Sequence, residues 1–478
     1  MPTLPDPART YPLLINGALV PGRGTPAPIR GPADGKLVGT AATASAADVL
    51  AAVDAAAHAA PEARALPSYA RAEVLQRIHD AAAARREELA VLLALEAGKP
   101  IKHARLEVDR MLFIFRDGAA EAMRIGGEVM PLDRMPHGTD RWGITRRFPL
   151  SPISAIVPFN FPLLLAAHKL APAIACGATM VLKTPPQDPL CVLTLAEILK
   201  DAGYPLGGIN VVQVPVEEAT PMLDDPRVRM ITFTGSARAG WYIRQRAHTK
   251  KVALELGGNA GVIVEGDADL EHAAARCAAG GFAFAGQSCI SVQRILVQRD
   301  AFNAFVAALV PKVRALKVGA PLDEQADLGP MIDETAAQRA EAWIREAVAD
   351  GAEIATGGER AGSVLQPTVL LHTTSDMKVN CEEVFAPVVT VRPYANFDDA
   401  LATLNDSPYG LQAGVFTSNL RKAWHAYETL EVGGVAINEI SGYRVDHMPY
   451  GGVKASGLGR EGVRYAIEEM TEIRLLMM

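Results

Sequence analysis

The segment ISAIVPFNFPLLLAAHKLAPAIACGATMVLK, residues 153–183, decides the fold class of this chain. A short β-type run at 153–157 is followed by an apolar helical stretch at 164–176 and by a second β-type run at 179–182. Strands that alternate with helices in this way are typical of βαβ units, whose consecutive strands lie parallel in one sheet. The segment therefore predicts an α/β fold.

The alternation extends along the chain from this segment. Strand candidates at 209–212 and 230–233 continue it. A second series of alternating strands and helices follows residue 255, with strand candidates at 261–264 and 291–297. Because 478 residues exceed one ordinary hydrophobic core, we expect two α/β domains, with the second beginning near residue 255.

Other parts of the chain follow different patterns. Ser45-Ala46-Ala47-Asp48 reads as a capping box and predicts the start of an alanine-rich helix. One long helix is predicted from about Ser68 to Leu95 and another from about Ile101 to Arg124. The Gly- and Pro-containing residues 126–152 predict a hairpin, and the tail 471–478 predicts an edge strand.

Composition and charge exclude several classes of protein. With 49% hydrophobic and 21% charged residues the chain is globular, and a net charge of −7 provides no basic field for nucleic acid or an anionic membrane. The apolar stretch 161–182 is interrupted by His168, Lys169 and Pro172, which argues against a membrane span. We expect neither nucleic acid nor a membrane as a partner.

The five cysteines are odd in number and widely scattered, at positions 176, 191, 277, 289 and 381. This pattern lacks the pairing of a disulfide framework and the close spacing of a zinc knuckle. It predicts a cytoplasmic protein without a metal ion, since reducing compartments keep thiols free.

Three residues are candidates for chemistry. Cys289 follows Gly286-Gln287-Ser288, where a thiol could act as a nucleophile or be an ordinary buried cysteine. Asn160 lies between two prolines, so its amide is either a rigid oxyanion donor or a turn residue. Glu255 ends an apolar run and is either a general base with a raised pKa or a paired structural carboxylate.

Candidates for cofactor binding lie at the predicted carboxyl ends of strands, where α/β proteins bind ligands. Lys183 ends one strand and suits a ribose or phosphate, although a solvated surface lysine is the common alternative. Gly235 and Ser236 open a helix after another strand, which suits a pyrophosphate or a plain turn. Glu383 and Phe385 suit a ribose diol and a nicotinamide ring, or an ordinary surface turn.

Taken together, these motifs resemble the NAD(P)-dependent aldehyde dehydrogenase superfamily over about residues 10–478. The matching motifs, in order, are PFNFP (158–162), Lys183, FTGS (233–236), ELGG (255–258), GQSC (286–289), EEVFAP (382–387), NDSPYGL (405–411) and MPYGGVKASGLGREG (448–462). The resemblance implies an enzyme that oxidises a small aldehyde to its carboxylate through a thioester on a cysteine, with NAD or NADP as cofactor.

The resemblance also assigns roles to matching positions. It implies Cys289 as the nucleophile, Glu255 as the base that activates water, and Asn160 as part of the oxyanion hole. Cofactor contacts are implied for Val157, Phe159, Lys183, Gly235, Ser236, Glu383 and Phe385.

The family fold implies three parts for this chain. These are a Rossmann-like cofactor domain at 1–125 and 151–255, a catalytic domain at 256–450, and an oligomerisation flap at 126–150 and 467–478. A homodimer or homotetramer is the implied assembly.

Some positions depart from the family pattern or bear on the substrate. Pro186 stands where many NAD-preferring members carry a ribose-binding Glu, which leaves NADP open beside NAD. Ser288 replaces an Arg of some members that handle phosphorylated substrates. The run 443–450 resembles the lactaldehyde and non-phosphorylating glyceraldehyde-3-phosphate dehydrogenase branch. It suggests a short, hydroxylated or anionic aldehyde, with Arg444 near the entrance or in a structural ion pair.

Two other functions remain as alternatives. A CoA-acylating semialdehyde dehydrogenase would pass the thioester to CoA and typically lacks the base that Glu255 resembles. A non-catalytic binding protein on the same fold would not need Cys289, Glu255 and Asn160 together.

Overall fold

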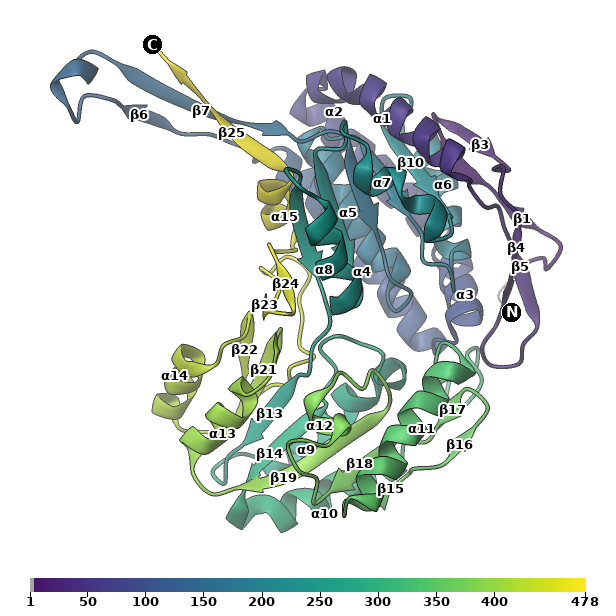
Figure 1. The fold of residues 1–478 in the computed structure, drawn as a ribbon, viewed down its shortest axis with the longest axis vertical. Coiled ribbons are helices and arrows are strands. Elements are labelled where there is room, and N and C mark those ends of the chain that lie inside the picture. Colours follow the sequence, from purple (N-terminus) through teal and green to yellow (C-terminus); the bar gives the residue numbers. More distant parts are fainter. Residues whose placement is uncertain (1–3) are drawn as a thin grey trace.

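In the computed structural model, which describes residues 4–478, the chain forms two α/β lobes and a projecting β arm (Figure 1). The first lobe is built on an eight-stranded sheet with the order β24-β12-β11-β8-β9-β10-β2-β3. Its strands are β2 (Leu13–Ile15), β3 (Ala18–Val20), β8 (Ile153–Ile156), β9 (Met180–Lys183), β10 (Ile209–Val212), β11 (Met230–Thr234), β12 (Lys251–Glu255) and β24 (Gly457–Leu458). Its five central strands are parallel.

The helices of the first lobe come mostly from the N-terminal half of the chain (Figure 1). They are α1 (Ala46–Ala65), α2 (Ser68–Ala84), α3 (Arg86–Ala97), α4 (Ile101–Ala122), α5 (Pro162–Cys176), α6 (Leu190–Asp201), α7 (Pro221–Asp224), α8 (Ala237–Arg246) and α15 (Val463–Glu469). A small sheet of β1 (Thr10–Tyr11), β5 (Leu37–Ala41) and β4 (Ala27–Arg30) lies beside them.

The second lobe is built on a seven-stranded sheet with the order β15-β18-β19-β14-β13-β21-β22. Its strands are β13 (Gly261–Val264), β14 (Arg294–Gln298), β15 (Glu353–Thr356), β18 (Thr368–Leu371), β19 (Val388–Tyr394), β21 (Gln412–Phe416) and β22 (Gly434–Ile437). Its helices are α9 (Leu270–Phe282), α10 (Phe302–Arg314), α11 (Glu334–Ala349), α12 (Lys378–Cys381), α13 (Phe397–Asn405) and α14 (Leu420–Thr429). Two short antiparallel pairs complete it, β16 (Arg360–Ala361) with β17 (Val364–Leu365) and β20 (Tyr409–Gly410) with β23 (Val453–Lys454).

The segment 153–183 forms the predicted βαβ unit. Strands β8 and β9 are parallel and in register from Ile153 opposite Met180, and every residue of the connecting helix α5 is buried. Gly177 adopts a left-handed φ of 80° at the end of α5, a conformation that a residue without Cβ adopts at little cost. The α/β prediction is confirmed here, and the mainly apolar helix α5 is covered on all sides.

The single helix predicted from Ser68 to Leu95 is wrong, because it divides into α2 and α3 at Arg85. The backbone of Arg85 leaves the helical region, with φ −107° and ψ 17°. Its guanidinium donates to Glu88 at 2.8 Å and to Glu197 at 3.1 Å. Glu197 lies 112 residues away, and no Gly or Pro marks the break, so the local sequence carries no signal for it.

The arm is a three-stranded antiparallel sheet that projects from the first lobe (Figure 1). It contains β6 (Val129–Pro131), β7 (Trp142–Pro149) and the C-terminal strand β25 (Thr471–Met477), which pairs with β7 along its whole length. The predicted hairpin and C-terminal edge strand are thus present, and β25 is an outer strand of this sheet. Among residues 4–478, no helix has the length and apolar character needed to cross a bilayer.

Candidate active site

A cavity of about 1180 Å³ is lined by residues of both lobes. Its walls include the carboxyl ends of β8, β9, β11 and β12, the turn after α9, and residues 440–450. Proteins with parallel sheets bind their ligands at these ends of the strands. Every residue that the sequence indicated for chemistry or cofactor binding lines this cavity. The tertiary structure therefore brings the sequence candidates into one place.

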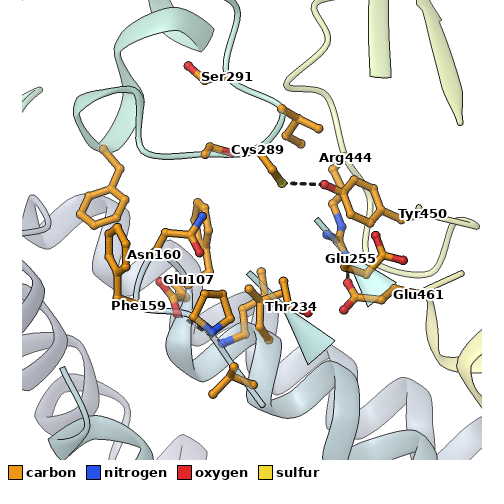
Figure 2. A pocket seen from close by; sticks show the side chains of 18 of the residues that line it. Glu107, Phe159, Asn160, Thr234, Glu255, Cys289, Ser291, Arg444, Tyr450 and Glu461 are labelled. Carbon is orange, nitrogen blue, oxygen red and sulfur yellow. Dashed lines mark hydrogen bonds and ion pairs between the residues drawn. The ribbon is translucent and has the colours of Figure 1, made fainter. Parts of the chain in front are cut away.

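Cys289 reaches the cavity by a sharp left-handed turn after α9. Phe284, Ala285 and Gly286 have φ values of 48°, 53° and 67°, a costly run for residues with side chains. A Cβ on Gly286 would lie 2.1 Å from the carbonyl oxygen of Ala386, so only glycine fits there. The turn directs Cys289 toward the first lobe (Figure 2).

The other cysteines do not share this setting. Cys176, Cys191 and Cys277 are buried in the described structure, away from the cavity. Cys381 is exposed, at the end of the short helix α12.

Asn160 lines the cavity beside the turn that carries Cys289 (Figure 2). Its side-chain Nδ2 donates to the main-chain carbonyl oxygen of Gln287 at 3.1 Å, and its main-chain carbonyl oxygen accepts from Lys99 Nζ at 2.6 Å. Lys99 is fully buried, pairs with Glu107, and lies 4.2 Å from the ring centroids of both Phe161 and Phe284. An amide carries two hydrogens, so Asn160 is held rigidly while one hydrogen stays available to a ligand.

Glu255 is the last residue of β12 and is buried at the floor of the cavity. Within the described chain its Oε2 has no hydrogen-bond partner. Burial, and then the neighbouring carboxylate of Glu461, raise the pKa of Glu255 well above its usual value, while Arg444 and Lys169 oppose the shift. A buried carboxyl with a free oxygen is suited to proton transfer rather than to a structural ion pair.

Tyr450 is a contact of Cys289 that sequence reasoning missed. The Tyr450 hydroxyl lies 2.9 Å from Cys289 Sγ, and the dashed line in Figure 2 marks this bond. The residue occurs in the motif 448–462, yet nothing in that motif indicated a contact with a thiol 161 residues earlier.

Arg444 does not lie at the cavity entrance as predicted. Its side chain is only 8% exposed and pairs with Glu461 at 3.1 Å. Its guanidinium also lies 3.8 Å from the ring centroid of Tyr450 and contacts His168 at 2.9 Å. The structural ion pair left open above is therefore present, since a buried charge is stable only when paired.

The cofactor candidates line the side of the cavity formed by the first lobe. Lys183 is buried at the end of β9, and burial lowers the pKa of its ammonium to about 8. Ser236 caps α8, where its hydroxyl accepts from the N–H of Ala239, and the N–H of Gly235 donates to the Glu255 carbonyl at 3.0 Å. A helix N-terminus with a hydroxyl beside a buried lysine suits the phosphates and ribose of a dinucleotide.

The remaining cofactor candidates lie closer to Cys289. Glu383 is partly buried and accepts from the N–H of Gly258 at 2.8 Å, and desolvation raises the pKa of its carboxyl to about 7. The rings of Phe159 and Phe385 meet edge to face at 5.9 Å, and Val157 lines the same wall. A carboxylate beside two aromatic rings suits a ribose and a planar nicotinamide. The described residues contain no cluster of His, Cys, Asp and Glu that could hold a metal ion.

Comparison with known proteins identifies the family. Residues 20–476 match the sequence model of the aldehyde dehydrogenase family. The chain belongs to this family. This dehydrogenase is 47% identical to the 3-sulfolactaldehyde dehydrogenase of Priestia aryabhattai, over 86% of each chain. The family resemblance stated from the sequence is confirmed.

Two solved structures resemble the dehydrogenase along nearly its whole length. Aldehyde dehydrogenase 21 of Physcomitrella patens, in complex with the reaction product succinate, has a TM-score of 0.97 and 41% identity, with 98% of each chain covered. Glyceraldehyde-3-phosphate dehydrogenase GapN of Methanocaldococcus jannaschii, complexed with NADP, has a TM-score of 0.92 and 38% identity, covering 95% of this chain and 99% of that one. The aldehyde dehydrogenase fold is confirmed, and this enzyme oxidises aldehydes with NAD or NADP.

Proposed function

We propose that this dehydrogenase oxidises a short anionic aldehyde to its carboxylate, with Cys289 as nucleophile, Asn160 as oxyanion donor and Glu255 as base. The observation that supports these roles is their convergence on one cavity, where Asn160 is hydrogen-bonded to the turn that carries Cys289 and Glu255 lines the same space (Figure 2). Nucleophilic catalysis on a carbonyl needs these three functions within reach of one carbon atom.

In the first step the Cys289 thiolate forms a carbon–sulfur bond with the aldehyde carbon. The carbonyl oxygen becomes an oxyanion, which accepts from the free amide hydrogen of Asn160 and from the main-chain N–H of Cys289. The hydrogen bond to Gln287 keeps the Asn160 amide in place before the substrate arrives, and the Lys99 contact holds the main chain of Asn160. Such preorganisation means that no rearrangement is needed as charge develops.

A bound nicotinamide would supply the acceptor for the hydride that leaves the aldehyde carbon, so that the carbonyl reforms as a thioester on Cys289. Val157, Phe159, Lys183, Gly235, Ser236, Glu383 and Phe385 are the residues that we propose hold it. Glu255 then removes a proton from a water molecule, whose oxygen attacks the thioester carbon and releases the carboxylate and the thiol. A buried carboxyl with a raised pKa suits this step, because its conjugate base takes up a proton readily.

An anionic substrate is supported by two basic residues on the cavity wall. Arg110 forms a paired contact with Asp446 at 2.9 and 2.6 Å, and Arg276 donates one bond to Glu439 at 2.7 Å. A guanidinium has five N–H donors, so both residues retain donors for a ligand. The relative named for 3-sulfolactaldehyde and the relative solved with succinate point to the same acidic chemistry.

We expect kcat/KM for succinate semialdehyde to exceed that for the uncharged butanal by at least about tenfold, because a charge-assisted hydrogen bond is worth that much. The test is a matrix of 3-sulfolactaldehyde, succinate semialdehyde, lactaldehyde and butanal against NAD and NADP, followed by nicotinamide absorbance. Arg110→Gln and Arg276→Gln should reduce the preference, and Arg464→Gln on the exposed face of α15 should not.

Three outcomes of the same matrix would contradict the proposal. Equal kcat/KM for charged and uncharged aldehydes would contradict the proposal that the substrate is anionic. Formation of acyl-CoA on addition of CoA favours the CoA-acylating alternative, and inactivity toward all aldehydes with both cofactors favours a non-catalytic protein.

We also propose that Pro186 permits NADP as well as NAD, because no carboxylate at that position repels a ribose phosphate.

The division into a cofactor domain at 1–125 and 151–255 and a catalytic domain at 256–450 is likewise proposed, supported by the two separate sheets. A cytoplasmic location is proposed from the unpaired, scattered cysteines.

We further propose a homodimer or homotetramer assembled through the arm, residues 126–150 and 467–478. The outer strand β25 exposes a row of apolar side chains, namely Ile473, Leu475, Leu476 and Met477. Exposed apolar edge strands pair with another chain. The double variant Ile473→Lys/Leu475→Lys should lower the molar mass to that of a monomer in light scattering, and Leu420→Lys on α14 should not. An unchanged mass would contradict assembly through the arm.

A further inference from the structure

The position of the Tyr450 hydroxyl beside Cys289 is fixed by contacts of the Tyr450 main chain and of its ring. Tyr450 is 3% exposed, and its main chain exchanges two hydrogen bonds with Glu461, at 3.1 and 2.6 Å. Its ring packs with Ile290 and Leu411. A side chain held at its backbone and along its ring has little freedom, so the hydroxyl is fixed 2.9 Å from Sγ.

The surroundings of the sulfur make this bond important for the nucleophile. Burial raises the pKa of the Cys289 thiol to about 12, the carboxyls of Glu383 and Glu255 add to the shift, and Tyr450 and Arg444 oppose it. Within the described chain, Tyr450 is the side chain that hydrogen-bonds Sγ. Once the sulfur is a thiolate it has no hydrogen to give, so the phenol must be the donor.

Arg444 is placed to strengthen that donor. Its guanidinium lies 3.8 Å from the Tyr450 ring centroid and is held there by Glu461 at 3.1 Å and by His168 at 2.9 Å. A cation over an aromatic face is attracted by the ring electrons and polarises the ring. Burial, and to a lesser extent the nearby Cys289, raise the pKa of Tyr450 well above its usual value, so its hydroxyl keeps its hydrogen at neutral pH.

We propose that Tyr450 donates the hydrogen bond that orients the Cys289 sulfur and stabilises its thiolate, and that Arg444 is a positioning residue acting through the Tyr450 ring. This inference rests on the proposed role of Cys289 as nucleophile. It gives the buried Arg444 a part in catalysis without any contact with the substrate.

The test compares the wild type with Tyr450→Phe, which keeps the ring and its contact with Arg444 but removes the hydroxyl. Alkylation by iodoacetamide is followed from pH 6 to 10, with the modified cysteine identified by peptide mass spectrometry. We expect alkylation of Cys289 to slow by at least about tenfold at each pH, since a hydrogen bond to an ionised partner contributes at least this factor. Steady-state kcat/KM should fall by a similar factor, while cofactor affinity is unchanged.

The chain offers two controls for this test. The exposed Cys381 reports on the reagent and should be alkylated equally in both proteins. Tyr427→Phe, on the exposed face of α14, makes the same chemical change far from the site and should leave the Cys289 profile unchanged. Equal melting temperatures would show that Tyr450→Phe is folded.

The role of Arg444 is tested by Arg444→Lys, which keeps a charge for Glu461 but loses the planar stack. We expect alkylation of Cys289 to be slower than in the wild type, as in Tyr450→Phe. The double variant Tyr450→Phe/Arg444→Lys should be no slower than Tyr450→Phe alone. An additive loss would show that Arg444 acts independently of Tyr450. If Tyr450→Phe leaves the alkylation profile unchanged while Cys289→Ala is inactive, this inference fails and the proposed function stands; an active Cys289→Ala removes both.

Discussion

Replacement of Cys289 by alanine is expected to abolish aldehyde-dependent formation of NADH or NADPH. The left-handed turn at 284–286 directs one thiol into the cavity, and the fully buried Cys176, Cys191 and Cys277 cannot replace it. Without a nucleophile only binding and oxyanion stabilisation remain, so we expect the rate to fall by at least about 10³-fold. The measurement is the change in nicotinamide absorbance with the preferred aldehyde.

Cofactor binding should survive this substitution. The proposed cofactor residues lie on other elements of the cavity wall, and titration of protein fluorescence with NAD or NADP should give the wild-type affinity. Cys381→Ala, at the exposed cysteine, is the matched control and should retain full activity. A Cys289→Ala enzyme that still oxidises aldehydes would refute the thioester mechanism.

Replacement of Glu255 by glutamine is expected to separate the two halves of the reaction. Attack by Cys289 and hydride transfer do not need the base, so the variant should release about one equivalent of reduced cofactor per active site and then stop. We expect steady-state kcat to fall by about 10² to 10⁴-fold, the usual contribution of a general base. Mass spectrometry of the stalled enzyme should find the acyl group on Cys289.

The pH dependence gives a second readout for Glu255. Because its pKa is raised, the carboxyl carries a proton at low pH and cannot act as a base. The rate of thioester hydrolysis in the wild type should therefore rise with pH through the pKa of Glu255, and the glutamine variant should lose this dependence. Glu468→Gln, exposed on α15, should behave as wild type. A Glu255→Gln enzyme without a burst or a stalled acyl group would assign Glu255 another role.

The fold class and most of the helices and strands could be predicted from the amino-acid sequence. The strand–helix–strand unit at 153–183 is encoded by apolar residues close together in the chain, and the capping box at Ser45 and Asp48 is present as predicted. The same short-range patterns located the strand ends where Lys183 and Glu255 lie. Such features are readable because each depends on neighbours within a few residues.

The contacts between side chains that are distant in the sequence could not be predicted and are seen in the three-dimensional structure. The break at Arg85 depends on Glu197, the orientation of Asn160 on Lys99 and Gln287, and the Cys289 contact on Tyr450. It also placed Arg444 inside the protein, against the Tyr450 ring, rather than at the cavity entrance. The four hydrogen bonds that fix Arg85, Asn160 and Cys289 join residues 61 to 161 positions apart. Local periodicity carries no information about such contacts, because they form only once distant segments of the chain have packed together.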